Sequence, residues 1–240
     1  MRTLIIIPAY NEEEAIQKTL RSLLSLPDCD VVVINDGSLD RTAEQVTQHI
    51  AAHPEHAVRL VNLPLNVGIG GAMQTGFKYA ERAGYDYGIQ FDGDGQHSAE
   101  SLNALLSHAE EHGLDLCIGS RFLSDDANFR SSPLRRVGIR FFSILIGFLT
   151  RIRATDPTSG FRVYGRRSLA LFARVYPDDY PEPEVLLVCS RNDLKVGEFP
   201  VQMQERQGGV SSIRYWNTAY YMMKVTIAIL IDRIRAKELS

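Results

Sequence analysis

Cysteine is scarce in this 240-residue chain, and its placement does not suit a disulfide framework. The three cysteines, Cys29, Cys117 and Cys189, are odd in number, lie far apart and sit in apolar stretches. Small secreted domains stabilised by disulfides instead carry a dense and even-numbered set. We therefore predict three reduced thiols in a protein core, and a reducing compartment.

An excess of basic charge is also missing. The chain has 26 lysines and arginines against 29 aspartates and glutamates, which gives a net charge of -3 and a pI near 6.1. Non-specific nucleic-acid binding usually needs a strongly basic face. Nucleic acid is therefore not an expected partner, and any basic surface must be local.

Long hydrophobic runs are absent as well. Residues 141–150, the longest stretch without a charged side chain near the middle of the chain, have half of the ~20 residues that a membrane-spanning helix needs. The N-terminus enters a strand-like run at Leu4 without a small-residue cleavage site, so we predict no signal peptide. These observations favour a cytoplasmic chain that does not span a membrane, with one sizeable core.

What the sequence does contain is a regular alternation of apolar runs and helix-patterned segments. The apolar runs, rich in β-branched residues, are 4–10, 30–36, 57–63, 85–92 and 114–120. The segments between them, 12–25, 41–53, 69–83 and 98–112, have the length and patterning of helices. This alternation predicts an α/β fold, a Rossmann-like and mostly parallel sheet flanked by helices.

Ligands of such sheets collect at the carboxyl ends of the strands, so the polar residues just after each run are the candidate site. They are Tyr10, Asn11, Glu12, Asp36, Gly37, Ser38, Asn66, Gly68, Asp92, Gly93, Asp94 and Arg121.

Two carboxylates lie one residue apart after the fourth run, in "FDGDGQH". A solitary aspartate at this position is most often a helix cap or a turn residue. A D-x-D pair with glycines that allow close backbone approach is better explained by a divalent cation. We predict that Asp92, Asp94 and the neutral oxygen of Gln96 hold Mg²⁺ or Mn²⁺, with substrate phosphates completing the shell.

Several further motifs accompany this pair in order. "IIIPAYNEE", "VINDGSLDRT", "NVGIGGA", "FDGDGQH" and "GSR" together resemble the family 2 glycosyltransferases, which are inverting enzymes of GT-A fold. "DPTSGFRVY", "PEPEVLL" and "QERQGGVSS" resemble the branch that transfers sugars to polyprenyl phosphates, similar to dolichol-phosphate mannose synthases. The resemblance runs from about Leu4 to Ser212. It implies a GT-A catalytic domain over residues 1–212.

The resemblance also implies a nucleotide pocket. Its pattern places Pro8, Ala9, Tyr10 and Glu12 around the nucleotide and Asp36 on the base or ribose. A strand-ending turn and helix-capping acids are the alternative explanation for the same residues. UDP is the favoured donor nucleotide and GDP the alternative.

The glycine-rich segment that follows the third run suits a phosphate-cradling turn before a helix, whose N-terminal amides favour anions. We interpret Asn66, Gly68, Gly70 and, after the fourth run, Gly93 as close-approach positions near the donor.

A polyprenyl phosphate acceptor needs cations more than it needs a general base, because a phosphomonoester with a second pKa of ~6 is already mostly dianionic. Arg121 and Arg206 could pair with its oxygens. Arg206 begins "RQGGVSS", which contains Ser211 and resembles the family's R-x-x-G-x-S-K loop, with Ser212 where lysine is common. Asp156 is a helix cap or an ion-pair partner of Arg162, and the resemblance places it near the acceptor.

Two segments suit a membrane surface. On a helical projection of 136–152, within a predicted helix at 134–153, Arg136, Arg140 and Arg151 share one stripe and the rest is largely apolar and aromatic. The alternative is a buried helix with a polar edge. Residues 213–240 repeat the pattern and predict a second amphipathic helix, through which a small membrane-anchoring protein or a second copy of the chain could bind.

The resulting hypothesis is a metal-dependent, inverting glycosyltransferase. It would move a sugar from a nucleotide-diphosphate sugar to a polyprenyl phosphate, peripherally on the cytoplasmic face of the membrane. One alternative is transfer to a polysaccharide or glycolipid hydroxyl, which requires a catalytic base. Another is a catalytically silent binding subunit that keeps the fold.

Overall fold

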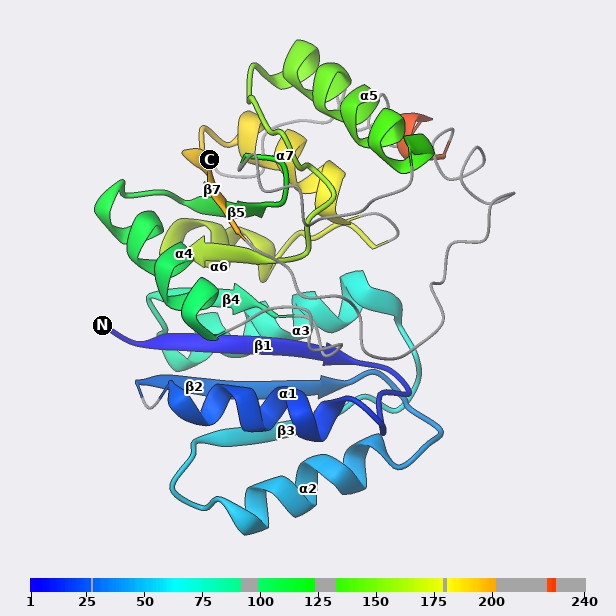
Figure 1. Cartoon of the computed structure of the whole chain (residues 1–240), viewed down its shortest axis with the longest axis vertical. Coiled ribbons are helices and arrows are strands. Elements are labelled where there is room, and N and C mark those ends of the chain that lie inside the picture. The colour runs from blue at the N-terminus through cyan, green and yellow to red at the C-terminus, as the bar shows by residue number, and fades with distance from the viewer. Residues whose placement is uncertain (27, 92–98, 124–132, 179–180, 202–223, 228–240) are drawn as a thin grey trace.

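The computed structural model describes residues 1–26, 28–91, 99–123, 133–178, 181–201 and 224–227. Within them the strands form one seven-stranded sheet in the order β3-β2-β1-β4-β6-β5-β7 (Figure 1). The strands are β1 (Thr3–Ala9), β2 (Cys29–Asn35), β3 (Val58–Asn62), β4 (Tyr87–Gln90), β5 (Leu116–Ser120), β6 (Arg162–Gly165) and β7 (Val196–Pro200). The first five correspond to the five predicted apolar runs.

All neighbouring strands are parallel except at β6, which runs antiparallel to β4 and β5. Arg162, the first residue of β6, therefore lies opposite Gln90 at the end of β4 and next to Ile118 of β5. The reversal brings the segment before β6 to the carboxyl edge of the parallel strands. The sequence patterns did not predict this strand.

Helices cover both faces of the sheet. They are α1 (Ile16–Ser22) with the short 3₁₀ helix η1 (Leu23–Ser25), α2 (Thr42–Ala52), α3 (Gly68–Ala83), α4 (Ala99–Glu111), α5 (Pro133–Thr150), α6 (Arg166–Phe172) and α7 (Pro181–Arg191). Core residues of α1, α2 and α4 pack on one face, and core residues of α3, α5, α6 and α7 pack on the other. The predicted fold class, a mostly parallel sheet flanked by helices, is confirmed.

Both faces of the central strands are apolar. Ile5 and Ile7 of β1 belong to one core layer, whereas Leu4 and Ile6 belong to the other, and all four are fully buried. Successive side chains of a strand point to opposite faces, so a strand covered on both sides reads as a continuous apolar run. This explains why the run "LIIIPA" lacks any polar alternation.

The three cysteines are buried and free, as predicted. Burial raises the pKa of Cys29 to about 11 and the pKa of Cys117 and Cys189 to about 12. A thiol that stays protonated is a poor nucleophile and a poor metal ligand, so all three act as small apolar core residues.

Helix α5 is apolar on two sides. Ile139, Phe142 and Ile146 are buried, and the helix packs on α7. The opposite side carries an exposed apolar stripe that consists of Val137, Phe141, Ile144 and Phe148, at helical spacing. One side of α5 is therefore a buried helix face, as the alternative interpretation expects. The other side is an exposed apolar face, as a helix at a membrane surface requires.

The predicted end of this helix at residue 153 is wrong. The helix ends at Thr150, and Arg151 adopts a left-handed backbone with φ of 64°. Arg151 therefore leaves the predicted basic stripe, whereas Arg136 and Arg140 remain exposed on the helix.

Most of the predicted C-terminal helix, 213–240, lies outside the described residues. Residues 224–227 are helical, and Val225 is fully buried in the core layer that contains α5 and α7. No helix within the described ranges is long and apolar enough to cross a bilayer.

A histidine cluster lies at the end of α2. His49 is 1% exposed, and its ring centroid lies 4.7 Å from that of His53 and 6.2 Å from that of His56. Among the described residues, no hydrogen-bond partner is found for either ring nitrogen of His49. Burial, with a smaller effect of the neighbouring histidines, lowers the pKa of His49 to about 4.

Because the folded-state pKa of His49 lies below its ordinary value of 6.5, the unfolded chain binds the proton more readily. Its contribution to stability is present above pH 6.5 and is lost as the pH falls toward 4. We expect His49→Leu to reduce the loss of unfolding free energy between pH 7 and pH 4.5 by ~1–3 kcal/mol, measured by urea denaturation. Gln48→Leu, at an exposed residue of α2 beside His49 that does not titrate, supplies the control and should leave the wild-type loss unchanged. Equal acid sensitivity of His49→Leu and wild type would contradict the prediction.

Candidate active site at the carboxyl edge of the sheet

The order of the strands reverses between β1 and β4. The chain passes from β1 outward to β2 and β3 and then returns to β4 on the other side of β1. In α/β sheets, ligands bind in the crevice at the carboxyl edge where the strand order reverses, so we expect a ligand at the ends of β1 and β4. Phe91 continues the pairing with β1, since its N–H donates to the carbonyl of Ile6 at 3.0 Å.

The predicted metal ligands follow Phe91 directly in the sequence. Asp92, Asp94 and Gln96, together with Gly93, lie outside the described residues, as do Arg206 and Ser211. Their assignment stays a prediction.

The loops after β1 and β2 are hydrogen-bonded to each other. The N–H of Asn11 donates to Ser38 Oγ at 3.0 Å, and the N–H of Leu39 donates to Asn11 Oδ1 at 2.9 Å. The N–H of Glu12 donates to Thr42 Oγ1 at 2.8 Å. Asn11 itself has φ of 55°, which asparagine tolerates better than most residues. These bonds hold the 10–12 segment in one shape.

The predicted nucleotide residues of β1 lie at the same place. Pro8 and Ala9 are the last two residues of the strand, and the carbonyl of Ala9 accepts from the N–H of Asp36 at 2.8 Å. The side chain of Tyr10 is exposed at the strand end. Pro8, Ala9, Tyr10, Glu12 and Asp36 therefore lie close together at the carboxyl edge, and their contact with a nucleotide stays a prediction.

Asp36 has a structural contact that its motif did not indicate. It is 3% exposed, and its carboxylate accepts from the N–H of Val67 at 2.8 Å and the N–H of Gly68 at 3.0 Å. Asn66 Oδ1 also accepts from the N–H of Gly68, at 3.1 Å. Asp36 thus fixes the turn into α3, where Gly68 has φ of 81°. The amide of Gly68, expected to face a phosphate, is bonded within the protein.

Gly70 is a close-approach position, but its neighbour is the chain itself. A β-carbon at Gly70 would lie 2.3 Å from the carbonyl oxygen of Pro177 and 2.5 Å from that of Asp178. The absence of a side chain allows α3 to pack against this segment. The predicted contact of Gly70 with the donor nucleotide stays untested.

A buried ion pair lies at the carboxyl end of β5. Arg121 donates from Nε to Asp156 Oδ2 at 2.5 Å and from Nη2 to Asp156 Oδ1 at 2.7 Å. Asp156 is fully buried and Arg121 is 8% exposed. Nη2 also donates to Thr158 Oγ1 at 3.1 Å. A guanidinium and a carboxylate in this two-pronged arrangement hold each other in one plane.

This pair corrects the sequence-based assignment of Asp156. Its ion-pair partner is Arg121 and not Arg162, which instead donates to the carbonyls of Ser159 at 2.7 Å and Pro157 at 2.9 Å. Sequence proximity favoured Arg162, whereas the antiparallel course of β6 sets Asp156 beside the end of β5.

Glu198 of β7 is a site residue that the sequence patterns missed. Its carboxylate accepts from the N–H of Thr155 at 2.8 Å and from the N–H of Asp156 at 3.0 Å. Burial raises the pKa of Glu198 even though these amides stabilise its charged form. No motif surrounds Glu198; only its position opposite Ile118 in the sheet brings it to the site.

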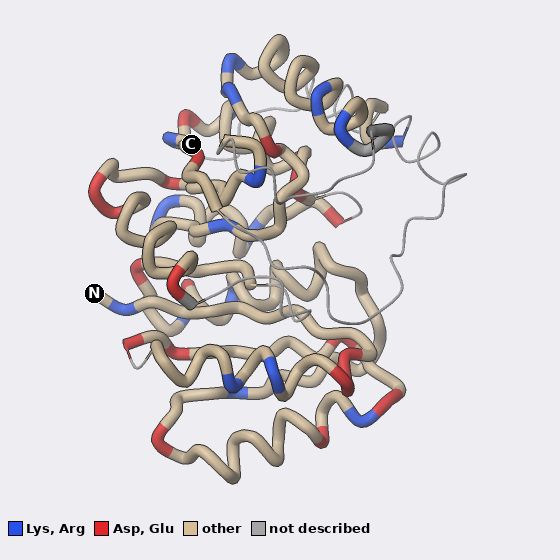
Figure 2. The backbone as a smooth tube through the Cα atoms, in the orientation of Figure 1, with Lys and Arg blue, Asp and Glu red and all other residues tan. Residues whose placement is uncertain are grey.

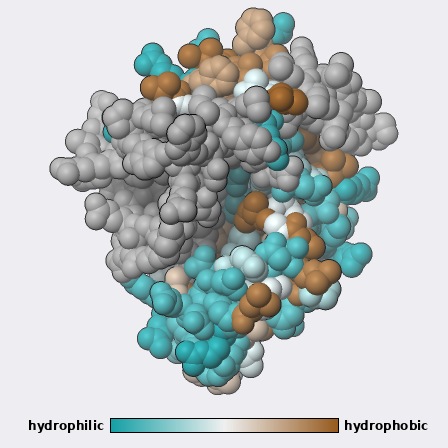
Figure 3. Space-filling model, turned by 90° about the vertical axis from the view of Figure 1, so that its right-hand side faces the viewer, coloured by the Kyte–Doolittle hydropathy of each residue, from teal (hydrophilic) through white to brown (hydrophobic). Residues whose placement is uncertain are grey.

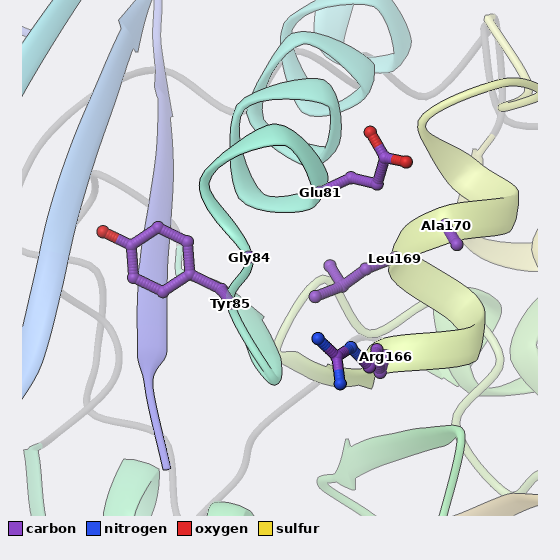
Figure 4. Close-up of a pocket in the computed structure, with 6 residues that line it drawn as sticks. All are labelled: Glu81, Gly84, Tyr85, Arg166, Leu169 and Ala170. Atoms are coloured by element: carbon purple, nitrogen blue, oxygen red, sulfur yellow. The ribbon is translucent and has the colours of Figure 1, made fainter.

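A pocket of about 240 Å³ lies at the other end of the strands, away from the carboxyl ends of the parallel strands (Figure 4). The residues that line it come from the end of α3 and from α6, and they are Glu81, Gly84, Tyr85, Arg166, Leu169 and Ala170. In Figure 4 the ring of Tyr85 points away from α6. None of the predicted site residues lines this pocket, so the carboxyl edge remains the candidate active site.

Comparison with known proteins shows the family of the chain. The family model described as Glycosyl transferase family 2 matches residues 4–172. A polyprenol monophosphomannose synthase of Mycolicibacterium smegmatis is 31% identical over 98% of this chain and 90% of its own length. An undecaprenyl-phosphate mannosyltransferase of Micrococcus luteus is 30% identical over 89% of this chain and 88% of its own length.

Solved structures share the fold at low identity. A mannosyltransferase of Pyrobaculum calidifontis in complex with GDP-Man and Mn²⁺ has a TM-score of 0.70 at 17% identity. The match covers 98% of this chain, which spans only 65% of that structure's length. Glucosyl-3-phosphoglycerate synthase of Mycobacterium tuberculosis, with Mn²⁺ and UDP-Glc, has a TM-score of 0.72 at 16% identity, over 99% of this chain and 81% of the other.

The close approach at Gly70 predicts a stability cost for a single methyl group. Gly70→Ala should lower the free energy of unfolding by ~1–3 kcal/mol, because the new β-carbon meets backbone oxygens that cannot rotate away. Urea denaturation measures the effect. Gly147→Ala in α5 is the matched control, since a β-carbon there meets only the carbonyl of Ile152 at 3.6 Å. An equal change in unfolding free energy for the two substitutions would show that the close approach to the backbone at residues 177–178 does not destabilise Gly70→Ala.

Proposed function

Because the chain belongs to glycosyltransferase family 2, we propose that it moves a sugar, with inversion, from a nucleotide-diphosphate sugar to a polyprenyl phosphate. One observation carries the proposal: the similarity to the Mycolicibacterium smegmatis polyprenol monophosphomannose synthase extends over 98% of this chain and 90% of that protein. A match of this extent includes the segments after β5, where an acceptor site would be built.

The donor would bind at the crevice between β1 and β4. Tyr10 offers an exposed ring for a nucleotide base, and the bonds around Asn11 and Asp36 hold the neighbouring loops in shape before the donor arrives. Pro8, Ala9 and Glu12 would border the same pocket, with Asn66, Gly68 and Gly70 at the turn into α3. A preformed pocket reduces the entropy lost on binding.

Asp92 and Asp94, with Gln96, would hold Mg²⁺ or Mn²⁺ at this crevice. Their oxygen donors suit either ion, and the segment follows β4 at the point where the strand order reverses. The ion, when bound, supplies positive charge that stabilises the departing nucleotide diphosphate.

Arg121 and Arg206 would bind the acceptor phosphate, with Ser211 beside them. The nucleophile is an anionic phosphate oxygen, so the protein's task is to hold it in line with the sugar carbon rather than to remove a proton. The buried pairing with Asp156 fixes the guanidinium plane of Arg121 at the carboxyl edge. The plane is set before any phosphate arrives, which suits a positioning function.

The lipid tail of such an acceptor requires contact with a membrane. The exposed apolar stripe of α5 (Val137, Phe141, Ile144 and Phe148) would insert at the headgroup layer of the cytoplasmic face, because Arg136 and Arg140 flank it and α5 carries no acidic residue. Figure 2 shows these positive charges along α5, and Figure 3 shows hydrophobic side chains gathered at the top of the molecule over this helix. The segment 213–240 would add a second contact, directly or through a small membrane-anchoring protein or a second copy of the chain.

The donor and metal assignments can be tested by thermal shift. In a panel of UDP- and GDP-sugars with Mn²⁺, one donor should raise the melting temperature. The binding free energy RT ln(1 + [L]/Kd), divided by the entropy of unfolding, gives the size of this shift. Asp94→Ala should lose the shift. Asp28→Ala, which removes an exposed aspartate before β2, is the control and should keep it. A shift that survives in Asp94→Ala would refute the metal assignment.

The acceptor assignment can be tested by charge reversal. With the donor so identified, wild-type protein should glycosylate undecaprenyl phosphate, and Arg206→Glu should lower kcat/KM for that acceptor at least ~100-fold. Transfer to a hydroxyl acceptor that survives in Arg206→Glu would favour the polysaccharide or glycolipid alternative. Absence of transfer to any acceptor, with donor binding intact, would favour the silent binding subunit.

The membrane assignment can be tested with vesicles. Phe148 is 85% exposed, so Phe148→Glu should leave folding intact and lower co-sedimentation with anionic vesicles at least ~10-fold. Leu39→Glu, at an equally exposed apolar residue in the β2 loop, is the control. An equal loss of vesicle co-sedimentation in both variants would show that α5 is not the specific membrane contact.

A further inference from the structure

The segment 155–159 carries the partner of Arg121 and lies at the carboxyl edge. It precedes β6, and the antiparallel course of β6 brings its first residues beside the ends of β4 and β5. Ser120 Oγ and Thr155 Oγ1 lie 2.6 Å apart, so the segment is also hydrogen-bonded to the end of β5. Any shift of this segment would move Asp156 and, with it, the guanidinium of Arg121.

Glu198 holds the beginning of the segment through its amides. Its carboxylate accepts from the N–H groups of Thr155 and Asp156, at 2.8 and 3.0 Å. Because Glu198 belongs to β7, which pairs with β5 in fixed register, its position is set by the sheet. A second carboxylate this close to Asp156 raises the electrostatic energy of the site, so packing alone gives no reason for a glutamate here.

Arg162 holds the end of the segment through its carbonyls. It is fully buried, and within the described ranges no carboxylate lies within ion-pair distance of its guanidinium. It donates instead to the carbonyls of Ser159 and Pro157. A buried charge without a carboxylate partner is costly, and an apolar side chain of similar volume would avoid the cost. What an apolar side chain could not provide is the pair of hydrogen bonds that the guanidinium donates to these two carbonyls.

We infer that Glu198 and Arg162 are positioning residues that clamp segment 155–159 from its two ends and thereby set Asp156 and the guanidinium plane of Arg121. Neither residue touches the acceptor; both act through the Arg121–Asp156 pair. The inference rests on the proposed function in one respect, namely that Arg121 binds the acceptor phosphate. The clamp itself is a statement about the protein alone and has its own readout.

The first experiment needs no substrate. Glu198→Gln keeps the shape of the side chain but replaces one carboxylate oxygen by a donor, so amide hydrogen exchange in a peptide covering 151–161 should become about ten-fold faster. Arg162→Lys, which keeps the charge but cannot reach both carbonyls, should do the same. Glu111→Gln, at an exposed glutamate that ends α4, is the control. Unchanged exchange in both clamp variants, with the fold intact by circular dichroism, would overturn the clamp.

The second experiment measures how the clamp acts on the reaction. Glu198→Gln should raise KM for the polyprenyl phosphate about 5- to 10-fold while kcat and the donor KM change less than about two-fold. In an Arg121→Lys background, which already lacks the two-pronged contact with Asp156, Glu198→Gln should add less than about 1.5-fold. Full multiplication of the two effects, or an equal rise in the donor KM, would show that Glu198 does not act through Arg121.

The two experiments separate the two ideas. Failure of the wild-type protein to use polyprenyl phosphate would refute the proposed function and leave the exchange result as a test of the clamp. Wild-type transfer with unchanged exchange in both variants would refute the clamp and leave the proposed function standing.

Discussion

The constraint on which the structure depends is that the sheet is covered by helices on both of its faces. Residues such as Leu4, Ile5, Ile6 and Ile7 have no exposed side to turn toward water. Polar groups are costly inside such layers unless they are hydrogen-bonded, so the strands carry few of them and the polar side chains accumulate where strands end. The apolar core and the polar edge are two results of the same requirement.

At the carboxyl edge, polar side chains form the hydrogen bonds to backbone groups that strand pairing forms in the interior. Asp36 accepts from the amides that open α3, and Glu198 accepts from the amides of Thr155 and Asp156. Arg162 donates to carbonyls of the neighbouring segment. The loops that carry these groups are thereby tied to the sheet. A catalyst that orients a donor and an anionic acceptor benefits from such rigidity.

The features that could be predicted depend on local sequence, and those that could not depend on contacts between distant segments. The five predicted parallel strands, the helices between them and the meeting of Pro8 to Glu12 with Asp36 could be read from periodicity and from the rule that parallel strands end at one edge. The antiparallel strand β6 could not, because "RVYG" is four residues long and carries no sign of its direction. The ion-pair partner of Asp156 depends on that direction, and so it was assigned wrongly.

The sequence by itself therefore determined the layered α/β fold and the motif residues that resemble a glycosyltransferase family, since each of these depends on local patterning, and it predicts the edge at which ligands would bind. Only the tertiary structure decided that Asp156 holds Arg121, that Glu198 and Arg162 hold the segment between them, and that Gly70 meets the backbone at 177–178. These contacts join residues that are distant in the chain or that lie on strands of unpredicted direction. Their geometry is set by sheet register and helix packing, which no short stretch of sequence encodes.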